Sequence, residues 1–112
     1  MTAALKEEQF GVLTTINVKA TMKEKLNADF RNYVILGACN PPFAHKVLTI
    51  NDKVGVLLPC NVCLQELEDR IEVFAMDPRH FMASDPDPEM RLLAAQVGEK
   101  LDRVLDKLAS QG

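Results

Sequence analysis

The sequence has no tryptophan, only one tyrosine and no long hydrophobic run. No apolar stretch approaches the roughly 18 residues that a membrane-spanning helix needs. Residues 1–8 also lack the apolar segment of a secretory signal peptide. We therefore expect a cytoplasmic protein with no membrane partner.

Positive charge is scarce and scattered, with 13 Lys and Arg against 16 Asp and Glu and a net charge of −3. Nucleic-acid binding needs basic side chains gathered on one face, so we expect no nucleic-acid partner. The sequence also lacks a glycine-rich phosphate loop, a dinucleotide fingerprint and a Ser-His-Asp order. Because no pair of carboxylates is marked out for acid–base work, we predict no catalytic residue and leave open whether the protein is an enzyme.

The composition is that of one globular domain over residues 1–112, with 47% hydrophobic and 26% charged residues. A domain of this size buries roughly two-thirds of the surface that its unfolded chain exposes. It therefore needs no disulfides to fold, and its three cysteines should stay reduced in the cytosol.

The hydrophobic pattern predicts both strands and helices. The strands fall at 10–18, 33–38, 54–58, 62–67 and 71–76. The first should bury Phe10, Val12 and Ile16. The second should be central and covered on both faces, and the last two should form an antiparallel hairpin. Pro59 should mark a bulge, a bend or an edge, because it cannot donate to a strand ladder.

Helix formers and capping residues predict helices at 2–8, 20–26, 41–50, 78–83 and 88–109. Asn27 should end the second of these helices, in which Met22 and Leu26 share one face. In the long C-terminal helix, apolar residues recur at spacings of three and four, namely Met90, Leu93, Val97, Leu101, Val104 and Leu108. This spacing predicts one buried face.

Cys39 has the most reactive environment that the sequence offers. Asn40 is a favoured N-cap and Pro41 a favoured first helical residue, so Cys39 should be the last residue before a helix. Unpaired backbone N–H groups and the positive end of the helix dipole favour a thiolate there. The alternative interpretation is a buried core cysteine.

A second Cys-Asn pair, Cys60-Asn61, follows another apolar run. If the two strands are neighbours, Cys39 and Cys60 should share one end of the sheet, with Cα atoms within about 7 Å. Cys63 should face the other way, which disfavours Cys60-x-x-Cys63 as a redox motif. With His45 added, the cysteines still match no common zinc pattern.

Four segments together carry a resemblance to a known family. They are Phe-Gly-Val-Leu at 10–13, Gly-Ala-Cys-Asn-Pro-Pro at 37–42, Leu-Leu-Pro-Cys-Asn-Val at 57–62 and Ala-Met-Asp-Pro at 75–78. On these segments the chain resembles the DUF302 family over nearly its whole length. The resemblance implies a single small α+β domain with an antiparallel sheet backed by helices, often dimeric, and with no established activity.

Members of that family usually begin with an extra strand and the first part of a helix, of which residues 1–8 resemble a remnant. A sheet without that strand exposes an edge, which proteins usually cover or pair. We therefore expect strand 10–18 to be covered by residues 1–8 or to pair with a second copy in a homodimer. Cys63 stands where the family more usually has an apolar residue, so Cys60-x-x-Cys63 is no family feature.

Our leading hypothesis is that the domain binds a small ligand or a soft metal ion at a site formed by Cys39, Asn40, Cys60 and Asn61. Cu(I) suits two or three thiolate ligands better than zinc does. One alternative is a thiol-based redox or sulfur-relay protein, with Cys39 as nucleophile and Cys60 as resolving partner. The other is a non-catalytic dimerisation module whose cysteines belong to the core.

Overall fold

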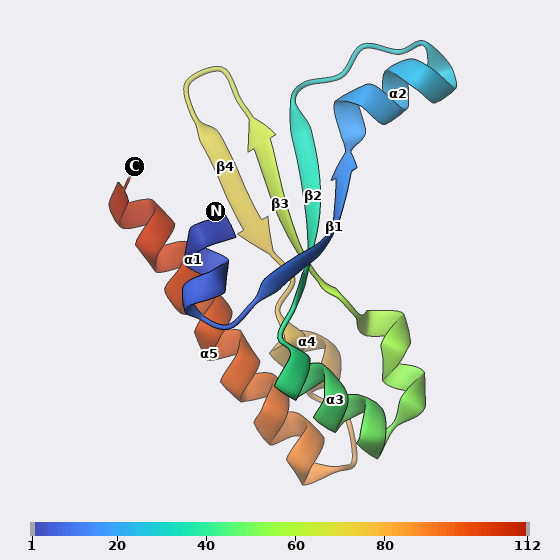
Figure 1. Ribbon diagram of the computed structural model, residues 1–112, viewed down its shortest axis with the longest axis vertical. Helices are drawn as coiled ribbons and strands as arrows, with labels where there is room; N and C mark the ends of the chain where they lie inside the picture. Colours follow the sequence, from blue (N-terminus) through green and yellow to red (C-terminus); the bar gives the residue numbers. More distant parts are fainter. Residues whose placement is uncertain (1, 112) are drawn as a thin grey trace.

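The computed structural model describes residues 2–111, and the side chains of residues 3–109. The chain forms a four-stranded antiparallel sheet in the order β1-β2-β3-β4 with helices packed against it (Figure 1), as expected of an α+β domain. The elements are α1 (Thr2–Glu7), β1 (Gly11–Asn17), α2 (Val18–Leu26), β2 (Tyr33–Cys39), α3 (Pro41–Ile50), the 3-10 helix η1 (Asp52–Leu57), β3 (Cys60–Glu66), β4 (Ile71–Ala75), α4 (Pro78–Met82) and α5 (Pro88–Gln111).

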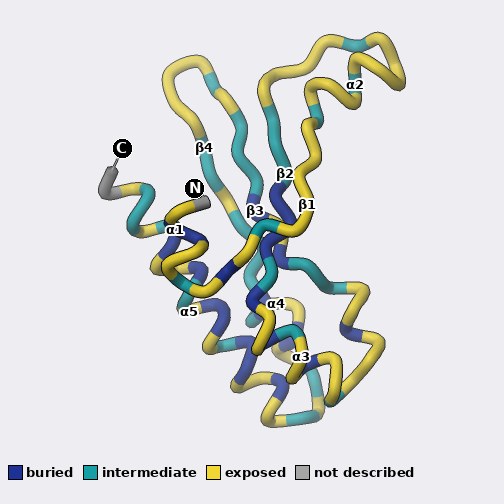
Figure 2. Tube along the Cα trace, viewed as in Figure 1, coloured by how far each residue is buried: buried dark blue, intermediate teal, exposed yellow. Residues whose placement is uncertain are grey.

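Helix α5 is the main cover of the sheet. Its predicted apolar face is buried at Met90, Leu93, Val97, Leu101 and Val104, and Leu108 packs beside them half-buried. Figure 2 shows this buried stripe running along α5. Each fully buried apolar side chain contributes about 1.5–3 kcal/mol, so the long helix supplies much of the core.

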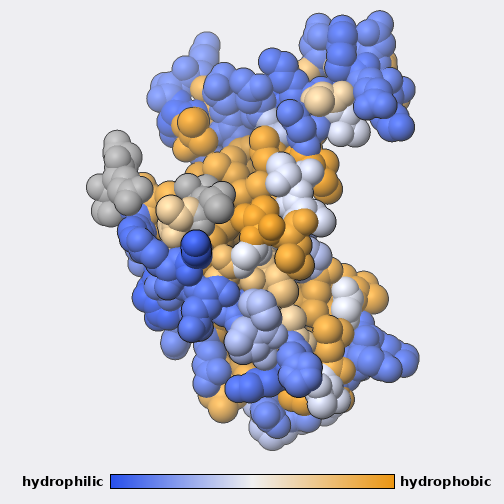
Figure 3. All heavy atoms as spheres, in the orientation of Figure 1, coloured by the Kyte–Doolittle hydropathy of each residue, from blue (hydrophilic) through white to orange (hydrophobic). Residues whose placement is uncertain are grey.

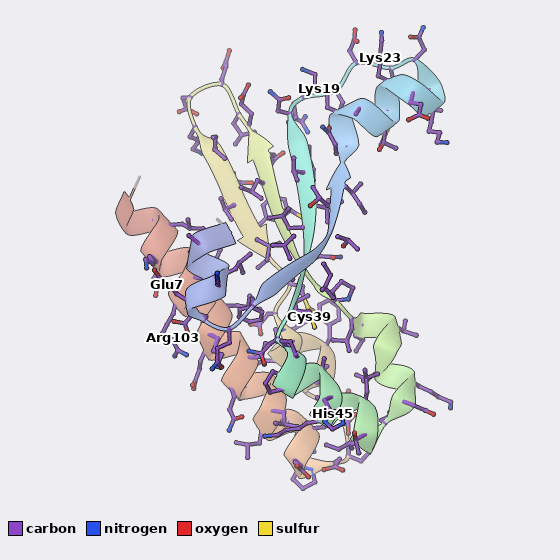
Figure 4. The ribbon with its side chains drawn as sticks, in the orientation of Figure 1. Glu7, Lys19, Lys23, Cys39, His45 and Arg103 are labelled. Atoms are coloured by element: carbon purple, nitrogen blue, oxygen red, sulfur yellow. The ribbon has the colours of Figure 1, made fainter. Side chains whose placement is uncertain are left out.

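Helix α1 lies beside α5 and joins the two ends of the chain. Leu5 is fully buried, and Phe10 follows it into the core at 3% exposure. The Arg103 Nε atom donates to Glu8 Oε1 at 2.9 Å. Glu7 pairs with Lys107 on the same side of α5, and Figure 4 shows Glu7 and Arg103 close together. The predicted N-terminal helix is therefore confirmed.

The two faces of the sheet differ in burial. Ala38, Cys60 and Val62 lie on the face that packs on the helices and are 0–3% exposed. On the other face, Ile16 is 48% and Phe74 38% exposed. The prediction that Ile16 is buried is therefore wrong, because the hydrophobic core lies on the opposite face of its strand.

Strand β2 is internal to the sheet, as predicted, but its cover is uneven. Leu36, Gly37 and Ala38 are buried, whereas Tyr33, Val34 and Ile35 are half-buried. Strand β2 is therefore covered on both faces only at residues 36–38, near its C-terminal end. In β1, Val12 is half-buried beside the core.

The predicted strand at 54–58 is wrong, because residues 54–57 lie in η1 and Leu58 is its C-cap. The Asn51 side chain accepts a hydrogen bond from the Lys53 N–H at 3.1 Å and starts a tight turn. Only Val54 of this helix is buried, and Val56 is 89% exposed. An apolar run therefore did not distinguish a strand from a 3-10 helix here. The Leu58–Pro59 peptide is cis and directly precedes β3.

The remaining elements follow their sequence signals. Strands β3 and β4 form the predicted hairpin, and α3, α4 and α5 begin at the predicted prolines. Helix α2 ends at Leu26, with Asn27 in the left-handed conformation at φ 51°. No helix within residues 2–111 combines the length and the apolar composition needed to cross a membrane.

Candidate functional site

Cys39 and Asn40 lie where β2 runs into α3, a junction that Figure 4 shows at the label of Cys39. The Asn40 Oδ1 atom accepts a hydrogen bond from the Phe43 N–H at 3.2 Å, and the Asn40 carbonyl accepts one from the Ala44 N–H at 2.9 Å. Asn40 is 5% exposed, whereas Cys39 is half-buried. The prediction that Asn40 is the N-cap of α3 is therefore confirmed.

The same cap changes the environment that was expected for Cys39. Pro41 and Pro42 have no N–H group, and the N–H groups of Phe43 and Ala44 are both bonded to Asn40. The first turn of α3 therefore has no free backbone donor for a Cys39 thiolate. The expectation of unpaired N–H groups beside Cys39 is therefore wrong.

Cys39 and Cys60 line one cavity of about 270 Å³. Its wall combines β1, α3 and the turn before β3, and its larger apolar residues are Leu13, Phe43, Leu48, Leu58 and Pro59. Figure 3 shows hydrophobic residues gathered over the sheet and down towards α3. A cavity of about 150 Å³ accommodates benzene, and pockets for drug-sized ligands begin near 300 Å³. This cavity therefore suits a compact, mainly apolar molecule.

Cys60 is buried at 3% exposure. It lies opposite Ala38 across the β2–β3 ladder, so the two cysteines come from neighbouring strand ends, as predicted. Burial, with a smaller contribution from the charge of Cys39, raises the pKa of the Cys60 thiol to about 11. Cys60 is therefore an uncharged thiol at neutral pH, whereas metal ligands and resolving nucleophiles must be thiolates.

Cys63 lies on the other face of β3 from Cys60, opposite Ile35 and beside Tyr33. It is half-buried and does not line the cavity. Cys63 faces away from Cys60, as predicted, so the Cys-x-x-Cys spacing does not bring two thiols together. The expectation that it also faces away from Cys39 is wrong, because alternation along β2 places Cys39 on the same face of the sheet as Ile35 and Cys63.

Asn61 and His45 are also apart from the two thiols. Asn61 lies opposite Gly37 and lines a neighbouring cavity of about 210 Å³ with Pro59 and Phe81. His45 is exposed on α3, and Figure 4 places it well beyond Cys39. Within the described part of the chain, no three His, Cys, Asp or Glu side chains are grouped to hold a metal ion. The structure therefore brings Cys39, Asn40 and Cys60 together without Asn61.

Sequence reasoning missed the apolar wall of the cavity. Leu13 is 67% exposed at the point where the β1–β2 register shifts. The apolar pattern around Leu13 does not show whether this residue belongs to a cavity wall or to the core. Gly37 did carry a signal, because glycine inside a strand indicates a close approach. A Cβ atom there would lie 2.8 Å from Pro59 Cγ and would also clash with Thr14. Gly37 thus lets Pro59 pack against β2.

Comparisons with known proteins agree with this architecture. A family model described as "Domain of unknown function DUF302" matches residues 1–108. The fold is similar to the crystal structure of an uncharacterized conserved DUF302 protein from Bacillus stearothermophilus, with a TM-score of 0.84 and 33% sequence identity over 94% of this chain and 82% of that chain. No curated protein matches the chain. On the family match and this structural similarity, the chain belongs to the DUF302 family.

Proposed function

We propose that the protein binds a compact, mainly apolar small molecule in the cavity between Cys39 and Cys60. The observation that carries this proposal is the composition of the wall, in which every residue except Asn40 is apolar or a cysteine. Binding pockets for small molecules have this character, with a few polar groups that orient the ligand. The volume of about 270 Å³ limits the ligand to a small ring system or a short chain.

The protonation state of Cys60 supports an apolar ligand. With its pKa raised to about 11, the thiol carries no charge at neutral pH, and an uncharged cysteine packs as a small hydrophobic residue. We infer that the protein acts in a reducing compartment such as the cytosol, where its three free cysteines stay reduced.

An NMR titration with indole as the probe tests this proposal. We expect saturable amide shifts around Leu13, Ala44 and Leu48, which line the cavity. Ala44→Leu should abolish them by filling the cavity, whereas Ala20→Leu makes the same change on exposed α2 and should leave them intact. Absence of saturable shifts in the wild type, or equal binding by Ala44→Leu, would overturn the proposal.

A soft metal ion such as Cu(I) is the second candidate ligand, because two sulfur-bearing side chains line one cavity. Binding would require Cys60 to lose its proton, so Cu(I) affinity should rise with pH. Cys39→Ser with Cys60→Ser should then abolish Cu(I) binding while retaining indole binding. Thiol chemistry would instead leave a covalent adduct on Cys39, which mass spectrometry detects.

We also propose that the protein forms a homodimer through β1. This strand is an edge of the sheet in residues 2–111, and its Leu13 and Ile16 side chains are 67% and 48% exposed. Helix α1 packs against α5 and leaves most of β1 uncovered. Light scattering coupled to size exclusion at low micromolar concentration should show a dimer, and Ile16→Glu should dissociate it by placing like charges near the two-fold axis. A monomeric wild type would refute this assembly.

A further inference from the structure

We propose that a second cavity, between α3 and α5, binds a small oxyanion: inorganic phosphate or the phosphate group of a monoester. This cavity measures about 140 Å³. Lys46 from α3 and Lys100 from α5 both line it, together with Asn40, Gln9 and Gln96, and no carboxylate does. The proposal does not depend on the apolar ligand of the neighbouring cavity.

The two lysines have no acidic partner among the residues that the structure describes. Lys46 has no ion pair with any described residue, and the Lys100 Nζ atom donates at 2.6 Å to the neutral amide oxygen Oε1 of Gln9. By contrast, Arg79 on α4 pairs with Asp102 at 2.9 Å, and Arg103 on α5 pairs with Glu8 at 2.9 Å. In a chain of net charge −3, this cavity therefore concentrates positive charge with no acidic side chain on its wall. An anion between the two ammonium groups would be attracted by both.

Asn40 provides an independent indication that an acceptor belongs here. Its Oδ1 atom is bonded to the Phe43 N–H, but its buried Nδ2 atom has no hydrogen-bond partner among the described residues. A buried donor left without an acceptor destabilises the folded protein. Asn40 lines both the apolar cavity and this one. Of the two, only this cavity has cationic side chains that would hold an oxyanion able to supply the missing acceptor.

The size of the cavity limits the ligand. A volume of about 140 Å³ corresponds to roughly five water molecules of the liquid. One tetrahedral oxyanion fits this space, whereas a whole nucleotide does not. The anion is therefore free phosphate, or the terminal group of a molecule whose remainder lies outside the cavity.

Isothermal titration calorimetry with inorganic phosphate, at constant ionic strength set by chloride, tests the proposal. The wild type should bind phosphate saturably. Lys46→Gln with Lys100→Gln should weaken binding at least tenfold, because both charges at the cavity are lost. The matched control is Lys19→Gln with Lys25→Gln on exposed α2, which changes the net charge equally and should alter affinity less than twofold. No saturable binding by the wild type, or an equal loss in the control pair, would overturn the proposal.

Asn40→Asp tests the amide separately. Aspartate keeps the capping oxygen of α3 but removes the donor and adds a negative charge, so phosphate binding should be lost while the thermal unfolding midpoint confirms a folded protein. Undiminished phosphate binding by this variant would contradict the placement of the anion. The affinities of phenyl phosphate and inorganic phosphate then distinguish the two sources of the anion. Equal affinities indicate that the site accepts the phosphate group of a monoester, whereas tighter binding of inorganic phosphate indicates the free anion.

Discussion

The two ends of the sheet are built differently. At the end near α3 and α4, Ala38, Cys60 and Val62 are 0–3% exposed, and both candidate binding cavities lie there. At the other end, α2 has no buried residue, and Leu26 is 70% exposed. Figures 1 and 2 show α2 extending away from the sheet with an exposed surface.

This difference shows that local capping signals are enough to form a helix but not to form a binding site. Helix α2 is capped at both ends: the Asn17 Oδ1 atom accepts the Ala20 N–H at 3.0 Å, and the Asn27 N–H donates to the Lys23 carbonyl. None of its residues is fully buried, so its stability comes mainly from local interactions. Both candidate binding cavities lie where α3 packs against the strand ends and α5, so we place binding at the packed end.

The largest predicted contrast is between two leucines of the short N-terminal helices. Leu5→Ala should destabilise the protein by about 2–5 kcal/mol, because it removes a fully buried side chain and leaves a cavity. Leu26→Ala should change the free energy of unfolding by no more than about 0.5 kcal/mol, since its side chain is 70% exposed. Urea unfolding measures both, and comparable losses would remove the distinction between a packed helix and an exposed one.

A glycine pair tests the packing beside the cavity. Gly37→Ala should cost about 1–3 kcal/mol, because the new Cβ would lie 2.8 Å from Pro59 Cγ and would displace the ring. Gly11→Ala is the matched control in the neighbouring strand, where nothing lies within 4 Å of the new atom. Thermal unfolding of both variants gives the comparison. A neutral Gly37→Ala would show that Pro59 moves freely.

The raised pKa of Cys60 predicts that the free energy of unfolding depends on pH. The unfolded thiol loses its proton near its ordinary pKa of 9, whereas the folded thiol keeps it up to a pKa of about 11. Stability should therefore be unaffected by this group below pH 8 and should fall by about 2 kcal/mol as the pH rises from 9 to 11. The loss should be absent from Cys60→Ala and retained by Cys63→Ala in denaturant titrations. The same alkaline loss in Cys60→Ala would assign it to other groups.

The smallest predicted contrast concerns the two asparagine caps. Asn40→Ala should cost about 1–2 kcal/mol and Asn17→Ala about 0.5 kcal/mol, because the first cap is buried in a packed helix and the second is exposed. Asn40→Ser restores a capping oxygen and should recover most of the loss. Equal effects of the two alanine variants would mean that packing of α3 does not depend on its cap.

Much of the fold could be predicted because its signals are local. Asn-Pro and Asp-Pro pairs located the starts of α3, α4 and α5, and the spacing of apolar residues identified the buried face of α5. The alternation of side chains along a strand correctly predicted that Cys60 and Cys63 lie on opposite faces of β3. What failed depends on tertiary packing: the burial of Ile16 depends on which face of β1 the core covers. The fold of residues 54–57 depends on a turn started by Asn51.

The candidate site could be predicted only in part. The two Cys-Asn pairs led to Cys39, Asn40 and Cys60, but the same motif placed Asn61 at a different cavity. The donors expected around Cys39 were missed because Pro41 and Pro42 lack them and Asn40 occupies the next two. The cationic cavity joins Lys46 and Lys100 from distant parts of the chain, a contact that no sequence spacing reveals.

Native mass spectrometry of protein purified without denaturation tests most directly whether the packed end holds a ligand. We expect the measured mass to include a noncovalently bound, compact organic molecule that is lost on denaturation. It should be present in the wild type and in Ala20→Leu, and absent from Ala44→Leu, in which the cavity is filled. The bare mass of the chain in all three proteins, or a ligand retained by Ala44→Leu, would contradict it.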